Sequence, residues 1–140
     1  MVIDASMLYQ MVDENEDVSK VVTTKITRML YLFSDSIDHS FNQDIGSWDV
    51  GNVTDMSVMF FGASSFNRDI SAWDMSNVTT MYFMFSNAES FNQDISFKIS
   101  AFGMPLMLQN TVLSDLMPPL GQNPNLTSLT VQNKTPQKLN

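Results

Sequence analysis

A repeat of 25 residues is the feature that most constrains the fold of this chain. The sequence Phe-Asn-Gln-Asp-Ile at residues 41–45 returns as Phe-Asn-Arg-Asp-Ile at 66–70 and as Phe-Asn-Gln-Asp-Ile at 91–95. Residues 41–65 and 66–90 are identical at 14 of 25 positions without a gap. Periods of about 20 to 50 residues are typical of proteins in which each unit stacks on its neighbours. The period therefore predicts a stack of similar units, but it says little about function.

The extent of the repeat divides the chain into three regions. We expect residues 1–40 to form an N-terminal cap and a degenerate repeat, residues 41–96 the regular repeats, and residues 97–140 an irregular C-terminal cap or a disordered tail. In the first region, apolar residues at helical spacing predict a capping helix over residues 3–12, loosely capped by Asp4. The residues that define its apolar face are Ile3, Met7, Leu8, Met11 and Val12.

The last region holds all five prolines and leaves several interpretations open. Leu126, Leu129 and Val131 have the spacing of one last leucine-rich strand; otherwise residues 104–140 would be mostly loop or disordered. The tail methionines Met104, Met107 and Met117 either form a partner-binding surface or dock on the last repeat.

Each regular unit is expected to contain a short strand and a short helix. The strands are predicted over residues 44–48 and 69–73, with Ile45 and Ile70 pointing inward. Apolar residues at i, i+3, i+4 and i+7 predict the helices, with Thr54 and Thr79 as N-caps and stops near Gly62 and Asn87. These apolar residues are Met56, Met59, Phe60 and Ala63 in one unit, and Met81, Met84, Phe85 and Ala88 in the next. The predicted fold class is α/β: a short right-handed solenoid of three to four coils, with parallel short strands, short helices and irregular terminal caps.

Composition excludes several classes of function. Seven basic and fifteen acidic residues give a net charge of −8, which disfavours binding to nucleic acid or to an anionic membrane. The absence of cysteine excludes disulfides, thiolate metal sites, cysteine nucleophiles and a cysteine-linked lipid anchor. No apolar stretch approaches the roughly 18 residues needed for membrane insertion. Residues 1–16 lack the basic start and apolar run of a secretory signal. The compartment is left open, because extracellular repeat proteins can also lack cysteine.

The full repeat motif is Phe-Asn-x-Asp-Ile-x-x-Trp-Asp-(Val/Met)-x-Asn-Val-Thr-x-Met-x-x-Met-Phe-x-x-Ala-x-Ser. It resembles the BspA-like leucine-rich repeat of bacterial surface proteins and mycoplasma lipoproteins. The resemblance covers residues 41–96 clearly and 17–40 weakly. It implies a leucine-rich-repeat-like solenoid at a cell surface or outside the cell, with a role in adhesion or protein binding. The chain differs from the family in its few repeats, its unrelated tail, and the lack of a signal peptide and lipid-anchor cysteine.

Polar side chains at equal repeat positions are expected to form ladders. Asn42, Asn67 and Asn92 would stack in one, and Asp44, Asp69 and Asp94 in another. These side chains either bond to nearby backbone N–H groups in turns or, for the aspartates, bind calcium. The single histidine, His39, is expected in a solvated turn, because no nucleophile or metal motif accompanies it. We therefore expect no enzymatic activity, and we assign no cofactor and no metal.

The sequence favours a non-enzymatic protein-interaction or adhesion module that binds another protein or a surface glycan through one exposed solenoid face. Residues that vary within the fixed motif are the candidates for that face. They form three rows: Gln43, Arg68 and Gln93; Ser47 and Ala72; and Asp55 and Thr80. The alternative is a structural fragment of a longer surface repeat array with no binding role of its own. The identity of the partner and the oligomeric state are left open.

Overall fold

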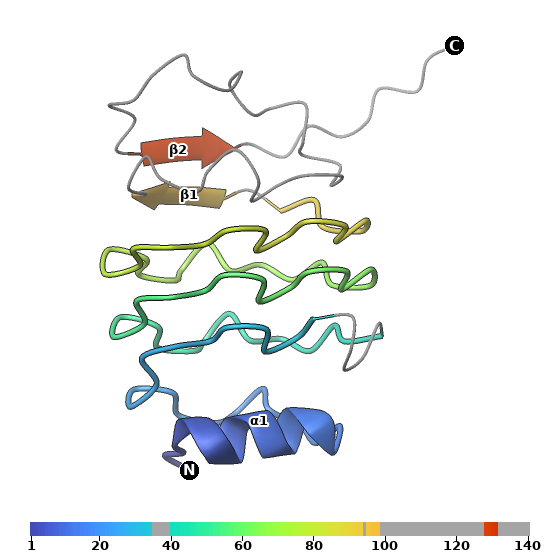
Figure 1. The fold of residues 1–140 in the computed structure, drawn as a ribbon, viewed down its shortest axis with the longest axis vertical. Helices are drawn as coiled ribbons and strands as arrows, with labels where there is room; N and C mark the ends of the chain where they lie inside the picture. Colours follow the sequence, from blue (N-terminus) through green and yellow to red (C-terminus); the bar gives the residue numbers. More distant parts are fainter. Residues whose placement is uncertain (35–39, 94, 99–127, 132–140) are drawn as a thin grey trace.

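The computed structural model describes residues 1–34, 40–93, 95–98 and 128–131. Its regular elements among these residues are one helix, α1 (Ala5–Asp13), and two strands, β1 (Ile95–Lys98) and β2 (Ser128–Val131). Figure 1 shows α1 at one end, layers of irregular chain above it, and the two strands at the other end. The sequence left open whether the stretch with Leu126, Leu129 and Val131 forms a last strand. β2 lies in this stretch, and it pairs antiparallel with β1, with Ile95 opposite Val131. His39, Asp94 and the tail methionines lie outside the described residues.

The N-terminal capping helix is present as predicted. It begins after Asp4, whose carboxylate accepts a hydrogen bond of 2.9 Å from the Met7 N–H group. This bond satisfies one of the N–H groups that the first turn of any helix leaves without a partner. Leu8 and Val12 are buried, whereas Met7, predicted on the apolar face, is exposed. The Tyr9 hydroxyl donates to the Leu30 carbonyl oxygen, which ties α1 to the first layer.

Equivalent segments of successive repeats lie side by side and run parallel. Met56, Val58 and Phe60 donate their N–H groups to the carbonyl oxygens of Thr80, Tyr82 and Met84, at 3.0, 2.8 and 2.8 Å. Met29, Tyr31 and Phe33 donate in the same way to Asp55, Ser57 and Met59. Between Met56 and Gly62 only alternate residues donate across, and isolated parallel bridges join Arg28 to Asp55 and Asp55 to Thr80. We call this set of contacts the inter-unit ladder.

The helix predicted between Thr54 and Ala63 is wrong, although its apolar face was identified correctly. Residues 57–62 form consecutive turns, in which Met59 donates to the Met56 carbonyl oxygen, Phe61 to Val58 and Ala63 to Phe60. These hydrogen bonds each join residues three apart, and the turns that they close bury the same positions as a helix would. Met56, Met59, Phe60 and Ala63 are accordingly fully buried. A helix is not formed because the intervening N–H groups donate to the next unit instead of to their own.

The predicted helix caps and repeat strands are wrong as well. The N–H group and hydroxyl of Thr79 both donate to the Thr54 carbonyl oxygen of the preceding unit, so they cap no helix. Around Ile45 the chain turns, with the Trp48 N–H group donating to the Ile45 carbonyl oxygen at 3.1 Å. Ile45 is nevertheless buried, as predicted, and so is its counterpart Ile70. The structure therefore keeps the predicted inward pattern without the predicted regular elements.

The core is a double column of phenylalanines with tryptophans beside it. Phe33, Phe60 and Phe85 stack with ring-centroid separations of 5.4 and 5.3 Å. Phe41, Phe66 and Phe91 form the second column, with separations of 5.9 Å at both steps. The two columns touch in every layer, at 3.8, 4.1 and 4.1 Å. Offset aromatic pairs of this kind contribute roughly 0.5–1.5 kcal/mol each beyond the area that they bury.

Three non-glycine residues at one repeat position have left-handed backbone conformations. Tyr31, Val58 and Phe83 have φ values of 60°, 62° and 55°. This conformation is unfavourable for ordinary side chains, and most of all for β-branched ones such as valine. The same conformation at Gly62 and Asn87, with φ of 69° and 59°, involves residue types that tolerate it.

Val58→Asn is expected to raise the free energy of unfolding by about 0.5–1 kcal/mol, because asparagine adopts the left-handed conformation more readily than valine. A urea titration followed by tryptophan fluorescence measures the change. Ser47→Asn, which introduces the same side chain at an exposed position, is the matched control and should change stability little. A destabilised Val58→Asn variant would mean that packing of the valine methyl groups outweighs the backbone strain.

Candidate binding surface

The row Gln43, Arg68 and Gln93 joins successive layers. Each side chain donates an N–H group to a main-chain carbonyl oxygen of the preceding unit: Gln43 to Glu16 at 2.9 Å, Arg68 to Asn42 at 2.7 Å and Gln93 to Asn67 at 3.1 Å. Gln43 also accepts from the Val18 N–H group at 2.8 Å. We call these three residues the donor row. Their variation preserves one chemical property, an N–H donor on a long side chain.

The neighbouring asparagines and aspartates also serve the backbone. The Asn42 side-chain oxygen accepts from the Asn67 N–H group, and the Asn67 side-chain oxygen accepts from Asn92, both at 2.9 Å. Asp69 accepts from the N–H group of Ser71, two residues on, at 2.9 Å. Hydrogen bonds from the Ser71 hydroxyl and N–H group lower the pKa of Asp69 below its usual value. The turn interpretation therefore accounts for the contacts of Asp44 and Asp69, whereas the asparagine side chains bond to the backbone of the next layer and not within a turn.

The other two predicted rows differ in their environment. Ser47 and Ala72 are exposed at equal positions. Asp55 and Thr80 meet on the inter-unit ladder, where Asp55 also forms an ion pair with Arg28 at 3.3 Å. The Thr80 hydroxyl lies 2.9 Å from that of Ser57. We call Arg28, Asp55 and Thr80 the bridge row. The structure thus brings Asp55 and Thr80 together across neighbouring units. Each side chain of the donor row, by contrast, contacts the backbone of the preceding unit.

A surface that the sequence predictions missed lies next to the bridge row. The left-handed residues Tyr31, Val58 and Phe83 occupy neighbouring rungs of the inter-unit ladder, and Tyr82 precedes Phe83. Tyr31 is 52% exposed and Tyr82 is 41% exposed, while Val58 and Phe83 are half-buried. We call these four residues the aromatic stripe. The sequence signal was a large apolar residue at positions 31, 58 and 83, which fall outside the buried i, i+3, i+4 pattern.

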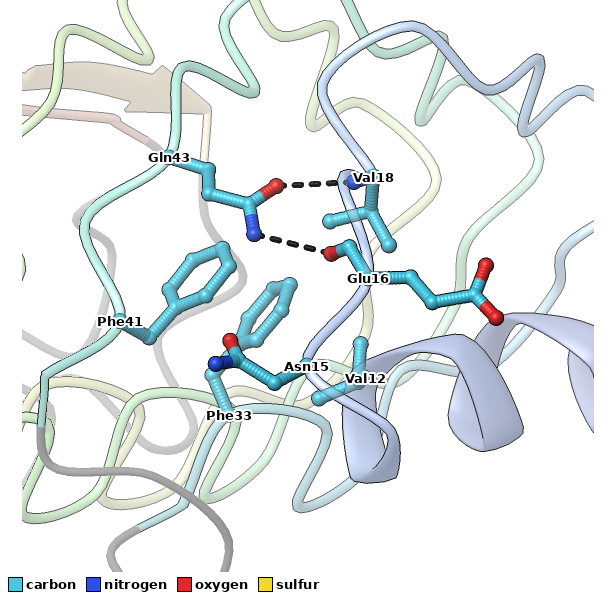
Figure 2. A pocket seen from close by; sticks show the side chains of 7 residues that line it. All are labelled: Val12, Asn15, Glu16, Val18, Phe33, Phe41 and Gln43. Atoms are coloured by element: carbon cyan, nitrogen blue, oxygen red, sulfur yellow. Dashed lines mark hydrogen bonds between the residues drawn. The ribbon is translucent and has the colours of Figure 1, made fainter.

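One small pocket lies between the end of α1 and the first layer, as Figure 2 shows. It is lined by Val12, Asn15, Glu16, Val18, Phe33, Phe41 and Gln43. Its volume of about 10 Å³ is the space of roughly one water molecule. This pocket is therefore too small to hold an organic substrate.

Chemistry-bearing groups are sparse in the part of the chain that the structure describes. No three histidine or acidic side chains lie close enough together there to hold a metal ion. The calcium alternative for the aspartate ladder depends partly on Asp94, which lies outside the described residues. No described helix has the length and apolarity that crossing a membrane requires. Burial raises the pKa of the Tyr9 phenol, whose hydroxyl is held by the Leu30 carbonyl oxygen.

The geometry defines a protein whose layers share one aromatic core and whose polar side chains mainly bond one layer to the next. The chain belongs to the family described as "Mycoplasma protein of unknown function, DUF285", whose model matches residues 4–112. This family is commonly considered to be related to the BspA-like leucine-rich repeats. No curated protein and no solved structure shows significant similarity to the chain.

Proposed function

We propose that this chain is a non-enzymatic protein-interaction or adhesion module, in which a short solenoid of leucine-rich-repeat type displays one binding face. The family match and the 25-residue spacing of the inter-unit contacts support the solenoid assignment. The face consists of the aromatic stripe and the adjoining bridge row. Binding then depends on shape and on apolar and polar contacts over several layers, and no bond in the partner is made or broken.

The observation that carries this proposal is the exposed Tyr31 at a strained backbone position that recurs in the next two layers, with a second exposed tyrosine, Tyr82, beside the last of them. A left-handed non-glycine residue costs of the order of 1–3 kcal/mol and commonly marks a functional site. Here the conformation recurs at Tyr31, Val58 and Phe83, and Tyr31 is more than half exposed. Exposed aromatic side chains are the residues that most often dominate protein interfaces, because they bury a large area with few rotatable bonds.

The polar atoms beside the stripe support the same face. The Arg28 guanidinium group is largely exposed and pairs with Asp55, so it keeps N–H groups available toward solvent. Interfaces and glycan sites both combine an apolar centre with hydrogen-bonding groups at its edge. The occupant is therefore another protein or a surface glycan that offers apolar area and oxygen acceptors.

The Tyr31→Ser/Tyr82→Ser double variant is expected to weaken binding by about tenfold or more, since it removes two aromatic contacts of hot-spot type. The measurement is binding of the labelled full chain to arrays of immobilised glycans and cell-surface proteins. Arg68→Glu, in the donor row, is the comparison variant, and thermal melts confirm that each variant folds.

Retention of binding by the tyrosine double variant would contradict the proposed face. Loss of binding in Arg68→Glu, with the tyrosine variant unaffected, would move the contact surface to the donor row. A chain that binds nothing on either array and also folds poorly in isolation would favour the alternative proposal, a structural segment of a longer surface array. That alternative predicts that the isolated chain folds poorly without further units.

A further inference from the structure

Side chains on the aromatic stripe differ in size and exposure from one layer to the next. In the first layer Tyr31 is 52% exposed, and in the third layer Tyr82 is 41% exposed. Ser57 and Val58 occupy the layer between them, since the Tyr31 N–H group donates to the Ser57 carbonyl oxygen and that of Val58 to Tyr82. Ser57 is buried and Val58 is half-buried. We call Ser57 and Val58 the low rung, because small side chains lie there between two exposed tyrosines.

The bridge row beside the low rung carries one charge of each sign. The Arg28 side chain is 65% exposed, and its guanidinium group donates to the Asp55 carboxylate at 3.3 Å. A guanidinium group has five N–H donors, and a carboxylate accepts several hydrogen bonds. The Asp55 side chain is still 17% exposed, so both groups can take a further partner. A molecule that satisfies both must present an acidic group to Arg28 and a basic group to Asp55, which an uncharged glycan does not.

We propose that the partner of this face is a second copy of the chain, packed face to face about a two-fold axis. The inference rests on the proposed function and names the partner of the same face. The axis lies in the plane of contact, parallel to the rungs, between the first and second layers. It reverses the order of the layers and keeps each row opposite itself, as in other isologous dimers. Tyr31 of each copy then covers the low rung of the other, and Arg28 of each copy faces Asp55 of the other.

Charge disfavours a two-fold axis placed through the second layer instead. Asp55 would then face Asp55 of the second copy, and like charges that meet across an interface are unfavourable. The low rung would also face itself, and Tyr31 would meet Phe83. With the axis between the first and second layers, Arg28 faces Asp55 twice, once on each side of the axis. One surface therefore supplies the base, the acid, the exposed ring and the low rung that receives it.

The contact involves few residues of each copy, so we expect weak association, which is typical of small transient interfaces. The net charge of −8 adds a repulsion between the copies. Salt reduces this repulsion, because the Debye length is about 8 Å at physiological ionic strength. Many copies displayed on one surface would raise the effective concentration, so weak self-association suits an adhesion module.

The test is sedimentation equilibrium of the full chain at physiological salt, up to about 1 mM, the dissociation constant of a very weak complex. The unaltered chain should form dimers as its concentration rises. Tyr31→Ser should raise the Kd of the dimer by about tenfold or more, because the symmetry removes two aromatic contacts at once. Arg28→Asp should have an effect of similar size. Lys20→Asp, which changes the charge equally at an exposed residue outside the face, is the control and should change the Kd by less than about threefold.

Mixing two variants separates a contact between copies from a contact within one copy. Arg28→Asp leaves two acidic residues at positions 28 and 55, and Asp55→Arg leaves two basic ones. Each variant alone should associate about tenfold or more weakly than the unaltered chain, since like charges then face each other. An equal mixture should form heterodimers, because position 28 of each copy then meets the opposite charge at position 55 of the other. A mixture of folded variants that associates no better than either variant alone would contradict the proposed axis.

A chain that stays monomeric at about 1 mM overturns this inference, whatever the arrays show. If such a chain binds an immobilised glycan or protein through its tyrosines, the proposed function stands with a different partner; if it binds neither, both proposals fail. Dimers that Tyr31→Ser and Arg28→Asp leave unchanged would also overturn the inference. Should these variants fail to fold, NMR signals of Tyr31 and Val58 in the unaltered chain should shift with concentration while that of the exposed Ala72 does not, and the absence of such shifts counts against the dimer.

Discussion

Phe60→Ala is expected to lower the free energy of unfolding by about 3–5 kcal/mol, the range for truncating a fully buried phenylalanine. Phe60 lies at the centre of the double column, where its ring packs against Phe33, Phe66, Trp73 and Phe85. Removal of the ring leaves a cavity that three layers border. Because folded domains are only about 5–15 kcal/mol more stable than their unfolded chains, this loss approaches the whole stability. Chemical denaturation followed by circular dichroism measures it.

Phe61→Ala is the matched control, because it removes the same side chain from the next residue. Phe61 is half-buried, and its counterparts in the other layers are Ser34 and Ser86. The expected loss is therefore below about 1–2 kcal/mol. Similar losses in Phe60→Ala and Phe61→Ala would contradict the aromatic core as described.

Trp73→Phe is expected to lower the free energy of unfolding by about 0.5–1.5 kcal/mol for its hydrogen bond alone. The indole N–H group donates to the Ile45 carbonyl oxygen of the preceding layer at 3.0 Å, and the bond is buried. Phenylalanine keeps most of the apolar contact but cannot donate, so the Ile45 carbonyl oxygen keeps only the hydrogen bond from the Trp48 N–H group. The smaller ring adds a further packing loss. Thermal unfolding followed by circular dichroism measures the change.

Tyr31→Phe serves as the comparison, since it removes one polar atom from an aromatic ring that is half exposed. Its effect should stay within about 0.5 kcal/mol, as for most surface substitutions. Trp48→Phe provides a second case, because the Trp48 indole donates in the same way to Val18 at 2.9 Å. We expect both tryptophan variants to lose more free energy of unfolding than Tyr31→Phe does.

The sequence was sufficient to predict the buried positions but not the backbone that buries them. The spacing of Met56, Met59 and Phe60 correctly identified a buried face. The same spacing arises from a helix and from consecutive four-residue turns, so periodicity alone could not separate them. The deciding feature is the left-handed conformation of Val58, which valine intrinsically disfavours. Only contacts with the next layer stabilise it, and a single unit of sequence does not contain them. The N-terminal helix, by contrast, depends on local signals such as Asp4, and it was predicted correctly.

The candidate site shows the same division. Variation among Gln43, Arg68 and Gln93 suggested an outward, partner-contacting row. In the structure these side chains share a donor role toward the preceding layer, which no comparison of residue types at one position would reveal. The aromatic stripe could have been suspected, because Tyr31, Val58 and Phe83 are apolar at a position that the helical pattern leaves exposed. The helix prediction itself concealed it, because a helix would have separated these side chains from the neighbouring units.

The central claim is that α1 and the repeat layers share one core and fold as a unit that displays the stripe. Thermal unfolding of the full chain, followed by the fluorescence of Trp48 and Trp73 and by far-ultraviolet circular dichroism, tests it most directly. The tryptophans report on two adjacent layers, and the dichroism reports on the whole backbone. We expect one cooperative transition with coincident midpoints for both signals. A gradual change, or two midpoints that differ, would contradict a continuous core and would favour a chain that needs further units to fold.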